Sequence, residues 1–334
     1  MPAITSGKVL VSGANGFIAV WVVRSLLEQG YSVRGTVRSA DKGKHLKEVF
    51  ASYGEKFEVV EVPDITVEGA FDEAVKGVDA IEHTASPFHF KAEDPAELLE
   101  PAVKGTVGIL ESARKHGTSV KRVIITSSVA AVLSVPSTPQ VFTEADWNDQ
   151  AVKEVEEKGR EASNAAKYRA SKTLAERAAW DFHSKHKAEV AWDVVALNPP
   201  MVFGPIIHEV SSPHAQNTSS QTMYDVFTKE GSTVGSGSWV DVRDIALAHV
   251  LGLQKEEAGG ERIIISAGAF SFQDLLDAAS SSSKHLKGTP GAGKDAVHQI
   301  RFNADKSVRL LELKYHTMAE TVADTLEDWE KKGW

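Results

Sequence analysis

Short apolar runs rich in β-branched residues alternate with longer amphipathic segments along the first two hundred residues. The apolar runs have the length and composition of buried strands. We predict strands over 8–12, 31–37, 57–62, 78–83, 120–126 and 190–197. The longer segments carry apolar residues at helical spacing, and some of them stop just before a glycine. We predict helices over 17–29, 41–53, 67–76, 97–116 and 161–186, and a terminal helix over 318–334.

This alternation predicts a doubly wound (Rossmann) α/β fold, in which crossover helices cover both faces of a mostly parallel sheet. We expect the cofactor-binding domain over 1–200, with 236–267 returning to it. A smaller C-terminal substrate lobe is expected from 201–235 and 268–334. Polar or Gly/Ser-rich composition predicts loops at 210–220, 231–238 and 280–283.

The composition is that of a globular protein, with 334 residues, 42% of them hydrophobic and 25% charged. The absence of cysteine excludes disulfides, thiolate catalysis and cysteine-based zinc sites. A formal net charge of -9 disfavours nucleic acid as a partner, because phosphate binding needs a basic surplus. No apolar run reaches the roughly 20 residues of a membrane helix. With no secretory signal after Met1, we expect a cytoplasmic protein.

A glycine-rich turn follows the first predicted strand and opens the first predicted helix. It reads Gly13, Ala14, Asn15, Gly16, Phe17, Ile18, Ala19. The first glycine permits a tight turn, and the second lets the backbone approach a pyrophosphate. The helix start then offers free N–H groups and partial positive charge to the phosphates. We therefore expect a dinucleotide cofactor here, contacted by Gly13, Asn15, Gly16, Phe17 and Ile18.

The end of the second predicted strand bears on the choice of cofactor. An NAD enzyme usually places Asp or Glu there for the ribose hydroxyls. This chain has Arg38 instead, with Lys42 about one turn later, and a guanidinium suits a 2′-phosphate. We therefore expect NADPH or NADP+. Asp64, with Ile65, follows the third strand and is a candidate for the adenine; Asp64 is equally a candidate N-cap of the next helix.

Tyr168 and Lys172 lie four apart in a predicted helix and so share one face. A nearby ammonium is expected to lower the pKa of the phenol and help it to move a proton. The fifth predicted strand ends at Ser127 and Ser128, and a hydroxyl there can steady a carbonyl oxygen. Strand alternation lets only one of the two serines face the cleft.

Taken together, these motifs resemble the extended short-chain dehydrogenases/reductases. Within them the chain is similar to the group of dihydroflavonol reductases, cinnamoyl-CoA reductases and fungal methylglyoxal and aldehyde/ketone reductases. The matching segments follow the same order along most of the chain: 13–19, Arg38 with Lys42, 83–88, 126–128, 168–172, 198–205 and 239–244. One mild departure is Ser12, which stands where threonine is usual.

The resemblance implies a catalytic group of Ser128, Tyr168 and Lys172, with Lys172 also holding the nicotinamide ribose. It implies that Thr84, Ala85 and Ser86 line the cofactor after the fourth strand. Pro199 and Val202 are implied near its nicotinamide end. The implied reaction is reduction of an aldehyde or ketone with hydride from NADPH.

Apolar residues near these motifs are candidates for the substrate pocket, and they suit a small hydrophobic carbonyl compound. They are Phe88, Val129, Met201, Tyr224 and Trp239. Two alternatives are a sugar-nucleotide epimerase or dehydratase on the same fold, and a non-catalytic NADP-sensing protein. The histidines show no ligand spacing, so no metal site is expected. The sequence leaves open whether the protein is a monomer or a homodimer.

Overall fold

The computed structural model describes residues 4–86, 92–229, 235–279 and 298–334. Its largest element is a seven-stranded sheet in which every described pairing is parallel. The strands, in spatial order, are β10 (Arg262–Ile264), β7 (Asp193–Asn198), β5 (Arg122–Thr126), β4 (Ala80–His83), β1 (Lys8–Ser12), β2 (Ser32–Val37) and β3 (Phe57–Glu61). The predicted doubly wound fold is therefore confirmed.

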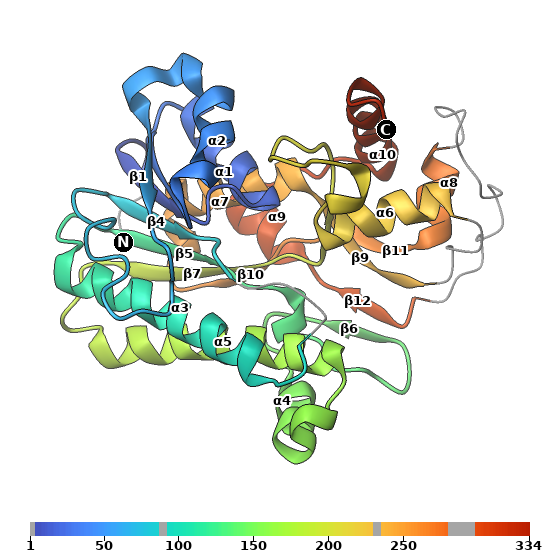
Figure 1. Ribbon diagram of the computed structural model, residues 1–334. Helices are drawn as coiled ribbons and strands as arrows, with labels where there is room; N and C mark the ends of the chain where they lie inside the picture. The colour runs from blue at the N-terminus through green and yellow to red at the C-terminus, as the bar shows by residue number, and fades with distance from the viewer. Residues whose placement is uncertain (1–3, 87–91, 230–234, 280–297) are drawn as a thin grey trace.

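Helices cover both faces of this sheet (Figure 1). α1 (Phe17–Glu28) and α7 (Val242–Gln254) pack together on one face, and α3 (Ala96–His116) and α5 (Asn164–His186) pack together on the other. Alternate residues of one strand enter separate cores: Val9 and Val11 on the α1 side, Leu10 on the α3 side. This two-sided burial explains why the strand segments are almost continuously apolar.

Strand order reverses between β1 and β4, because the chain runs from β1 outward to β3 and then returns to β4. At such a switch point the loops after the two strands diverge and leave a crevice at the carboxyl edge of the sheet. The Gly13 turn follows β1 and residues 84–86 follow β4. The topology therefore brings two of the predicted cofactor segments to the same edge of the sheet.

Two predicted helices are wrong or incomplete. Residues 67–76 form successive turns, because Gly69 has a φ of +74°, a left-handed value that interrupts a right-handed helix. The predicted helix 41–53 divides into a 3-10 turn (Ala40–Gly43), α2 (Lys44–Val49) and a second 3-10 turn (Ala51–Lys56). The other predicted helices and strands are present, with ends displaced by up to a few residues.

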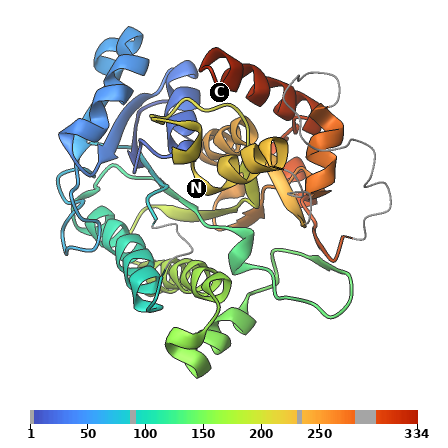
Figure 2. The same ribbon diagram turned by 45° about the vertical axis from the view of Figure 1, so that its right-hand side comes forward.

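A smaller mixed sheet lies beside the large one. β8 (Met201–Phe203) pairs in parallel with β9 (Ser236–Asp241), which pairs antiparallel with β11 (Gly268–Ser271). Around it lie α6 (Thr218–Thr228), α8 (Phe272–Ala279) and α10 (Met318–Lys331), with α10 against α8 (Figure 2). The other strands and α-helices of the described residues are β6 (Gln140–Phe142), paired with β12 (Ile300–Phe302), and α4 (Asp149–Lys158) and α9 (Asp305–Leu311).

The predicted loops are only partly loops. Residues 210–220 contain a 3-10 turn (Pro213–Ala215) and the start of α6, whereas β9 begins within 231–238. Residues 280–283 and Phe88 lie outside the described residues. The terminal helix is confirmed as α10, where Thr317 and Glu320 form a capping box.

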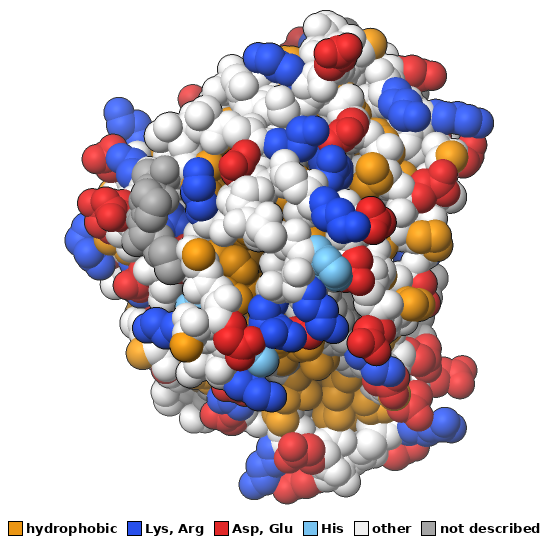
Figure 3. Space-filling view, turned by 90° about the vertical axis from the view of Figure 1, so that its left-hand side faces the viewer, with side chains coloured by type: hydrophobic (Ala, Val, Ile, Leu, Met, Phe, Trp, Pro, Cys, Tyr) orange, Lys and Arg blue, Asp and Glu red, His pale blue; other side chains and the backbone are white. Residues whose placement is uncertain are grey.

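The surface mixes charges of both signs. On the face drawn in Figure 3, acidic and basic side chains are interspersed over most of the area. Such a pattern gives this face no extended field of one sign. Among the described residues, no helix is both long and apolar enough to cross a membrane.

Candidate active site

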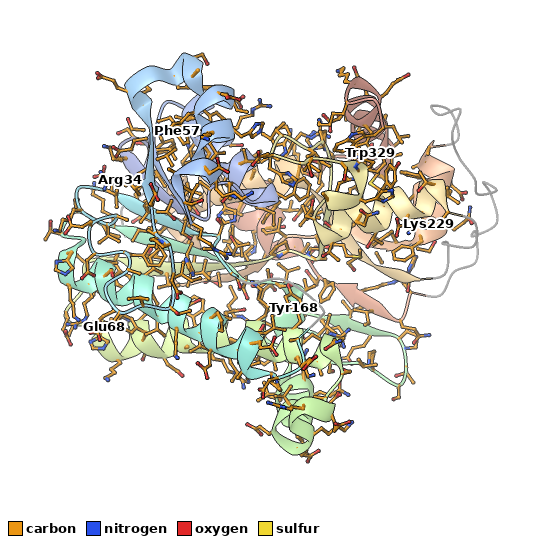
Figure 4. The ribbon with its side chains drawn as sticks, in the orientation of Figure 1. Arg34, Phe57, Glu68, Tyr168, Lys229 and Trp329 are labelled. Atoms are coloured by element: carbon orange, nitrogen blue, oxygen red, sulfur yellow. The ribbon has the colours of Figure 1, made fainter. Side chains whose placement is uncertain are left out.

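Tyr168 and Lys172 both lie on α5, and Tyr168 is labelled in Figure 4. The helix begins after Ser163, whose side chain accepts a hydrogen bond from the backbone N–H of Ala166 (3.1 Å). This N-cap, five residues before Tyr168, fixes the start of the helix. Tyr168 is partly exposed, whereas Lys172 is only 9% exposed. The two side chains therefore differ in their access to solvent.

Burial shifts the pKa values of both groups. It raises the pKa of Tyr168 to about 12, against the opposing effect of a hydrogen bond with Ser128. It lowers the pKa of Lys172 to about 8, against the opposing charge of Glu176. The expected lowering of the Tyr168 pKa is therefore wrong for the protein without ligand, because desolvation of the phenolate outweighs the other influences. The phenol accordingly keeps its proton near neutral pH.

The two serines after β5 point in different directions. Ser128 hydrogen-bonds to Tyr168, and its hydroxyl also lies 3.3 Å from the carbonyl oxygen of Pro199. Ser127 instead donates to the buried carboxylate of Glu176 (2.6 Å). The hydroxyl beside the phenol is thus that of Ser128, which is the serine that the resemblance implies.

The Gly13 turn has the geometry of a phosphate cradle. Gly13 has a φ of +64°, and a Cβ there would lie 3.2 Å from Ala85. Gly16 is exposed, and α1 begins after it without a side-chain cap and without an acidic residue in its first turn. The first N–H groups of α1 are therefore available to an anion, and the residues present fit a dinucleotide.

The turn after β4 is fixed by Ser12. Its hydroxyl accepts hydrogen bonds from the backbone N–H groups of Thr84 and Ala85 (both 3.0 Å) and lies 2.9 Å from Nδ1 of His83. Burial and the nearby charge of Lys172 lower the pKa of His83 to about 3, so this ring is neutral. Ser12 therefore holds the backbone of Thr84 and Ala85 in place, next to Ser86.

The candidate 2′-phosphate residues lie at the exposed end of β2. Arg38 is exposed, and Nζ of Lys42 is 3.8 Å from a carboxylate oxygen of Glu209. Asp64 accepts from the backbone N–H (2.8 Å) and hydroxyl (2.7 Å) of Thr66. These bonds, with a smaller contribution from the charge of Arg38, lower the pKa of Asp64. Asp64 caps a local turn, since the helix that it was expected to cap is absent.

The neighbouring predicted cofactor residues are firmly packed. Ile65 is partly buried, and a Cβ on Gly105 of α3 would lie 2.7 Å from its side chain. The carbonyl of Pro199 accepts from the N–H of Val129 (3.1 Å), and the buried Val202 lies in β8. Pro199 is therefore fixed beside Ser128, at the point where the chain leaves the large sheet.

The described candidates for the substrate pocket occupy several positions. Val129 is buried directly after Ser128, and Met201 is the strand partner of the buried Trp239. The ring of Tyr224 packs edge-on against Trp329 of α10 (5.2 Å between centroids) and against His214. The structure therefore brings Val129 next to Ser128 and puts Tyr224 against α10. Within the described part of the chain, His, Asp and Glu side chains form no group of three or more that could hold a metal.

The model of the NAD dependent epimerase/dehydratase family matches residues 9–268. The chain belongs to this family. Among its relatives, the ketoreductase azaE of Aspergillus niger is 36% identical, over 96% of each chain. GRP2 of Candida albicans, a putative NADPH-dependent methylglyoxal reductase, is 38% identical over 96% of this chain and 98% of its own.

A solved structure of a reductase is also similar to this member of the epimerase/dehydratase family. The crystal structure of yeast methylglyoxal/isovaleraldehyde reductase Gre2, complexed with NADPH, matches with a TM-score of 0.88 and 35% identity. The match covers 98% of this chain and 99% of that chain. The resemblance to extended short-chain dehydrogenases/reductases is thereby confirmed.

Two polar residues of this family member escaped the sequence-based reasoning. Glu176 lies one helical turn after Lys172, and Asn198 ends β7 before Pro199. Both side chains are almost fully buried and hydrogen-bonded to each other (2.8 Å). The sequence did contain one indication of Glu176. Tyr168, Lys172 and Glu176 follow one another at intervals of four residues, so all three lie on one face of the helix.

Proposed function

We propose that the protein is an NADPH-dependent reductase of small aldehydes or ketones. The observation that carries this proposal is the hydrogen-bonded pair of Ser128 and Tyr168, with Lys172 one helical turn away. The group comes from α5 and from the turn that follows β5. Support also comes from the relatives, since the ketoreductase, the methylglyoxal reductase and Gre2 are named for reactions at carbonyl groups.

NADPH, when bound, supplies the hydride to the carbonyl carbon. The chain's own residues then act on the carbonyl oxygen. Ser128 donates a hydrogen bond to it, and Tyr168 transfers the phenolic proton to the developing alkoxide. A pKa of about 12 suits this donor role, because the phenol is fully protonated at neutral pH when the substrate arrives.

Other residues hold the cofactor in this proposal. The N–H groups at the start of α1 hold the pyrophosphate, and the turn at 84–86 lines its path. Arg38 and Lys42 bind the 2′-phosphate, since no acidic residue follows β2 directly to take the ribose hydroxyls. Lys172 holds the nicotinamide ribose, close to Pro199 and Val202. Asp64 and Ile65 are the candidates for the adenine.

The test is a panel of aldehydes and ketones, with NADPH oxidation followed by absorbance and the alcohols analysed on a chiral phase. We expect turnover with at least one class of apolar carbonyl compound. The variant Tyr168→Phe removes the proton donor but keeps the ring, so kcat should fall roughly a thousandfold. NADPH binding, measured by its fluorescence, should persist in this variant. Unchanged turnover by Tyr168→Phe would show the mechanism to be wrong.

A further inference from the structure

A buried carboxylate lies directly behind the catalytic group. Glu176 is 1% exposed and follows Lys172 by one turn of α5. We propose that Glu176 is a positioning residue: its carboxylate locks the strand ends that carry Ser128 and Pro199, and its charge keeps Lys172 protonated. This role presupposes the proposed reductase function.

Glu176 is hydrogen-bonded from several separate elements. One carboxylate oxygen accepts from the hydroxyl of Ser127 (2.6 Å) and from the side-chain amide of Asn198 (2.8 Å). The other accepts from Nε of Arg262 in β10 and from the indole N–H of Trp180 (3.2 Å). One side chain therefore connects α5 with the ends of β5 and β7 and with β10.

These partners match the acceptor capacity of the Glu176 carboxylate. Each of them presents an N–H or O–H group to the carboxylate oxygens. A protonated carboxyl group would use one oxygen as a donor and would lose at least one of these bonds. The guanidinium of Arg262 adds a full positive charge beside the carboxylate. The set as a whole therefore suits a group that only accepts hydrogen bonds, as a carboxylate does.

The bonds of Glu176 act next to the reacting groups. Ser127 precedes Ser128, and Asn198 precedes Pro199, whose carbonyl oxygen lies 3.3 Å from the Ser128 hydroxyl. The amide of Asn198 also donates to the backbone carbonyl of Ser128 (3.1 Å). Loss of the carboxylate would remove one side-chain hydrogen bond from each strand end at once. Catalytic hydrogen bonds depend on such fixed geometry, so kcat should respond more than KM.

The charge of Glu176 acts on Lys172. Burial lowers the pKa of Lys172 to about 8, and Glu176 is the charge that opposes this decrease. Two other titratable groups lie near Lys172: Tyr168, one turn earlier on α5, and His83 at the end of β4, on which the charge of Lys172 acts. Both are neutral near pH 7, because their pKa values are about 12 and about 3. Glu176 thus supplies the negative charge that the ammonium needs in this buried position.

The test separates the charge of Glu176 from its bonds. Glu176→Gln removes the charge and also the bonds at one oxygen, because an amide NH2 cannot accept, whereas Ser127→Ala removes one bond and leaves the charge. Asp181→Asn is the matched control, because it removes an exposed carboxylate from the same helix. The first measurement needs no cofactor. The Lys172 side chain is titrated by NMR of ¹³C-labelled lysine, with its signal assigned from Lys172→Arg.

We expect the pKa of Lys172 to be near 8 in the wild-type protein and at least about one unit lower in Glu176→Gln. Ser127→Ala and Asp181→Asn should leave it within a few tenths of a unit. In the pH profile of carbonyl reduction, the alkaline decrease of kcat should move to lower pH in Glu176→Gln by the same amount. Ser127→Ala should lower kcat at every pH without moving the profile.

Two outcomes would overturn the proposal. One is a Lys172 titration in Glu176→Gln that coincides with that of the wild-type protein. The other is a kcat in Ser127→Ala and Glu176→Gln that equals that of Asp181→Asn. If Glu176→Gln fails to fold, Glu176→Asp keeps the charge and should retain the Lys172 pKa; a decrease there would count against the proposal. A wild-type protein that reduces no carbonyl compound would refute the reductase function and leave the NMR result intact.

Discussion

The two ends of the predicted cofactor site are built in different ways. At the catalytic end, Ser128, Tyr168 and Lys172 are backed by buried groups that hydrogen-bond to one another, with Glu176 and Asn198 behind them. At the 2′-phosphate end, Arg38 is exposed and Lys42 has only a 3.8 Å contact with Glu209, whose side chain is 59% exposed. Pre-arranged geometry is needed where bonds are made and broken, whereas mobile surface charges are sufficient to select a phosphate.

This comparison implies a ranking of mutational effects. Changes at the catalytic end should reduce kcat strongly and depend little on salt, because the polar groups behind it, Glu176 and Asn198, are buried. Changes at the phosphate end should affect cofactor affinity more weakly and should fade as the ionic strength rises.

Removal of the Ser128 hydroxyl should give the largest of these effects. In Ser128→Ala, kcat should fall by about a hundredfold to a thousandfold, since a hydrogen-bond donor to the carbonyl oxygen is lost. The substitution also removes the acceptor of the Ala130 N–H (3.1 Å), so the melting temperature should decrease slightly. Ser119→Ala, just before the start of the same strand, is the control. Equal kcat values for the two variants would remove Ser128 from the catalytic group.

Replacement of Arg38 should change cofactor preference by an intermediate amount. In Arg38→Asp, kcat/KM for NADPH should fall about tenfold to a hundredfold, because a charge-assisted pair with the 2′-phosphate is lost and a repulsion is gained. The value for NADH should stay constant or rise. Arg309→Asp makes the same charge change on an exposed residue of α9. If both variants keep the wild-type ratio of kcat/KM for NADPH to kcat/KM for NADH, Arg38 does not bind the 2′-phosphate.

Replacement of Lys42 should have the smallest effect. In Lys42→Ala, KM for NADPH should rise roughly twofold to fivefold at low salt, as expected for an exposed charge, and the difference should shrink at high salt. Glu209→Gln should have the opposite sign, since it frees Lys42 from its competing carboxylate. An effect of Lys42→Ala that is independent of salt would contradict this assignment.

The sequence predicted the large sheet well, because strands buried on both faces are marked by continuous apolar runs such as that of β1. The predicted helix at 67–76 is wrong, because the apolar residues have helical spacing but Gly69 has a left-handed φ. Local spacing cannot reveal the conformation that tertiary packing imposes on a glycine.

The parts of the candidate site that are formed by local sequence motifs were predictable. The glycine turn and the Tyr168–Lys172 pair are local patterns, and the structure gives both the expected secondary structure. Alternation alone left Ser127 and Ser128 equivalent, because their difference depends on Glu176, 49 residues beyond Ser127. A glutamate in a helix looks like a solvated charge until its partners at 127, 198 and 262 are brought together in space.

The pairing of Glu176 with Arg262 has a consequence for synthesis of the chain. Arg262 is 86 residues after Glu176 in the sequence. A nascent chain therefore contains Ser128, Tyr168 and Lys172 long before β10 has left the ribosome. Until then, Glu176 lacks its guanidinium, and an unpaired carboxylate resists burial. The catalytic group should therefore be completed late in translation, when β10 docks at the edge of the sheet. A polypeptide truncated before Arg262 should contain every catalytic residue and yet remain inactive.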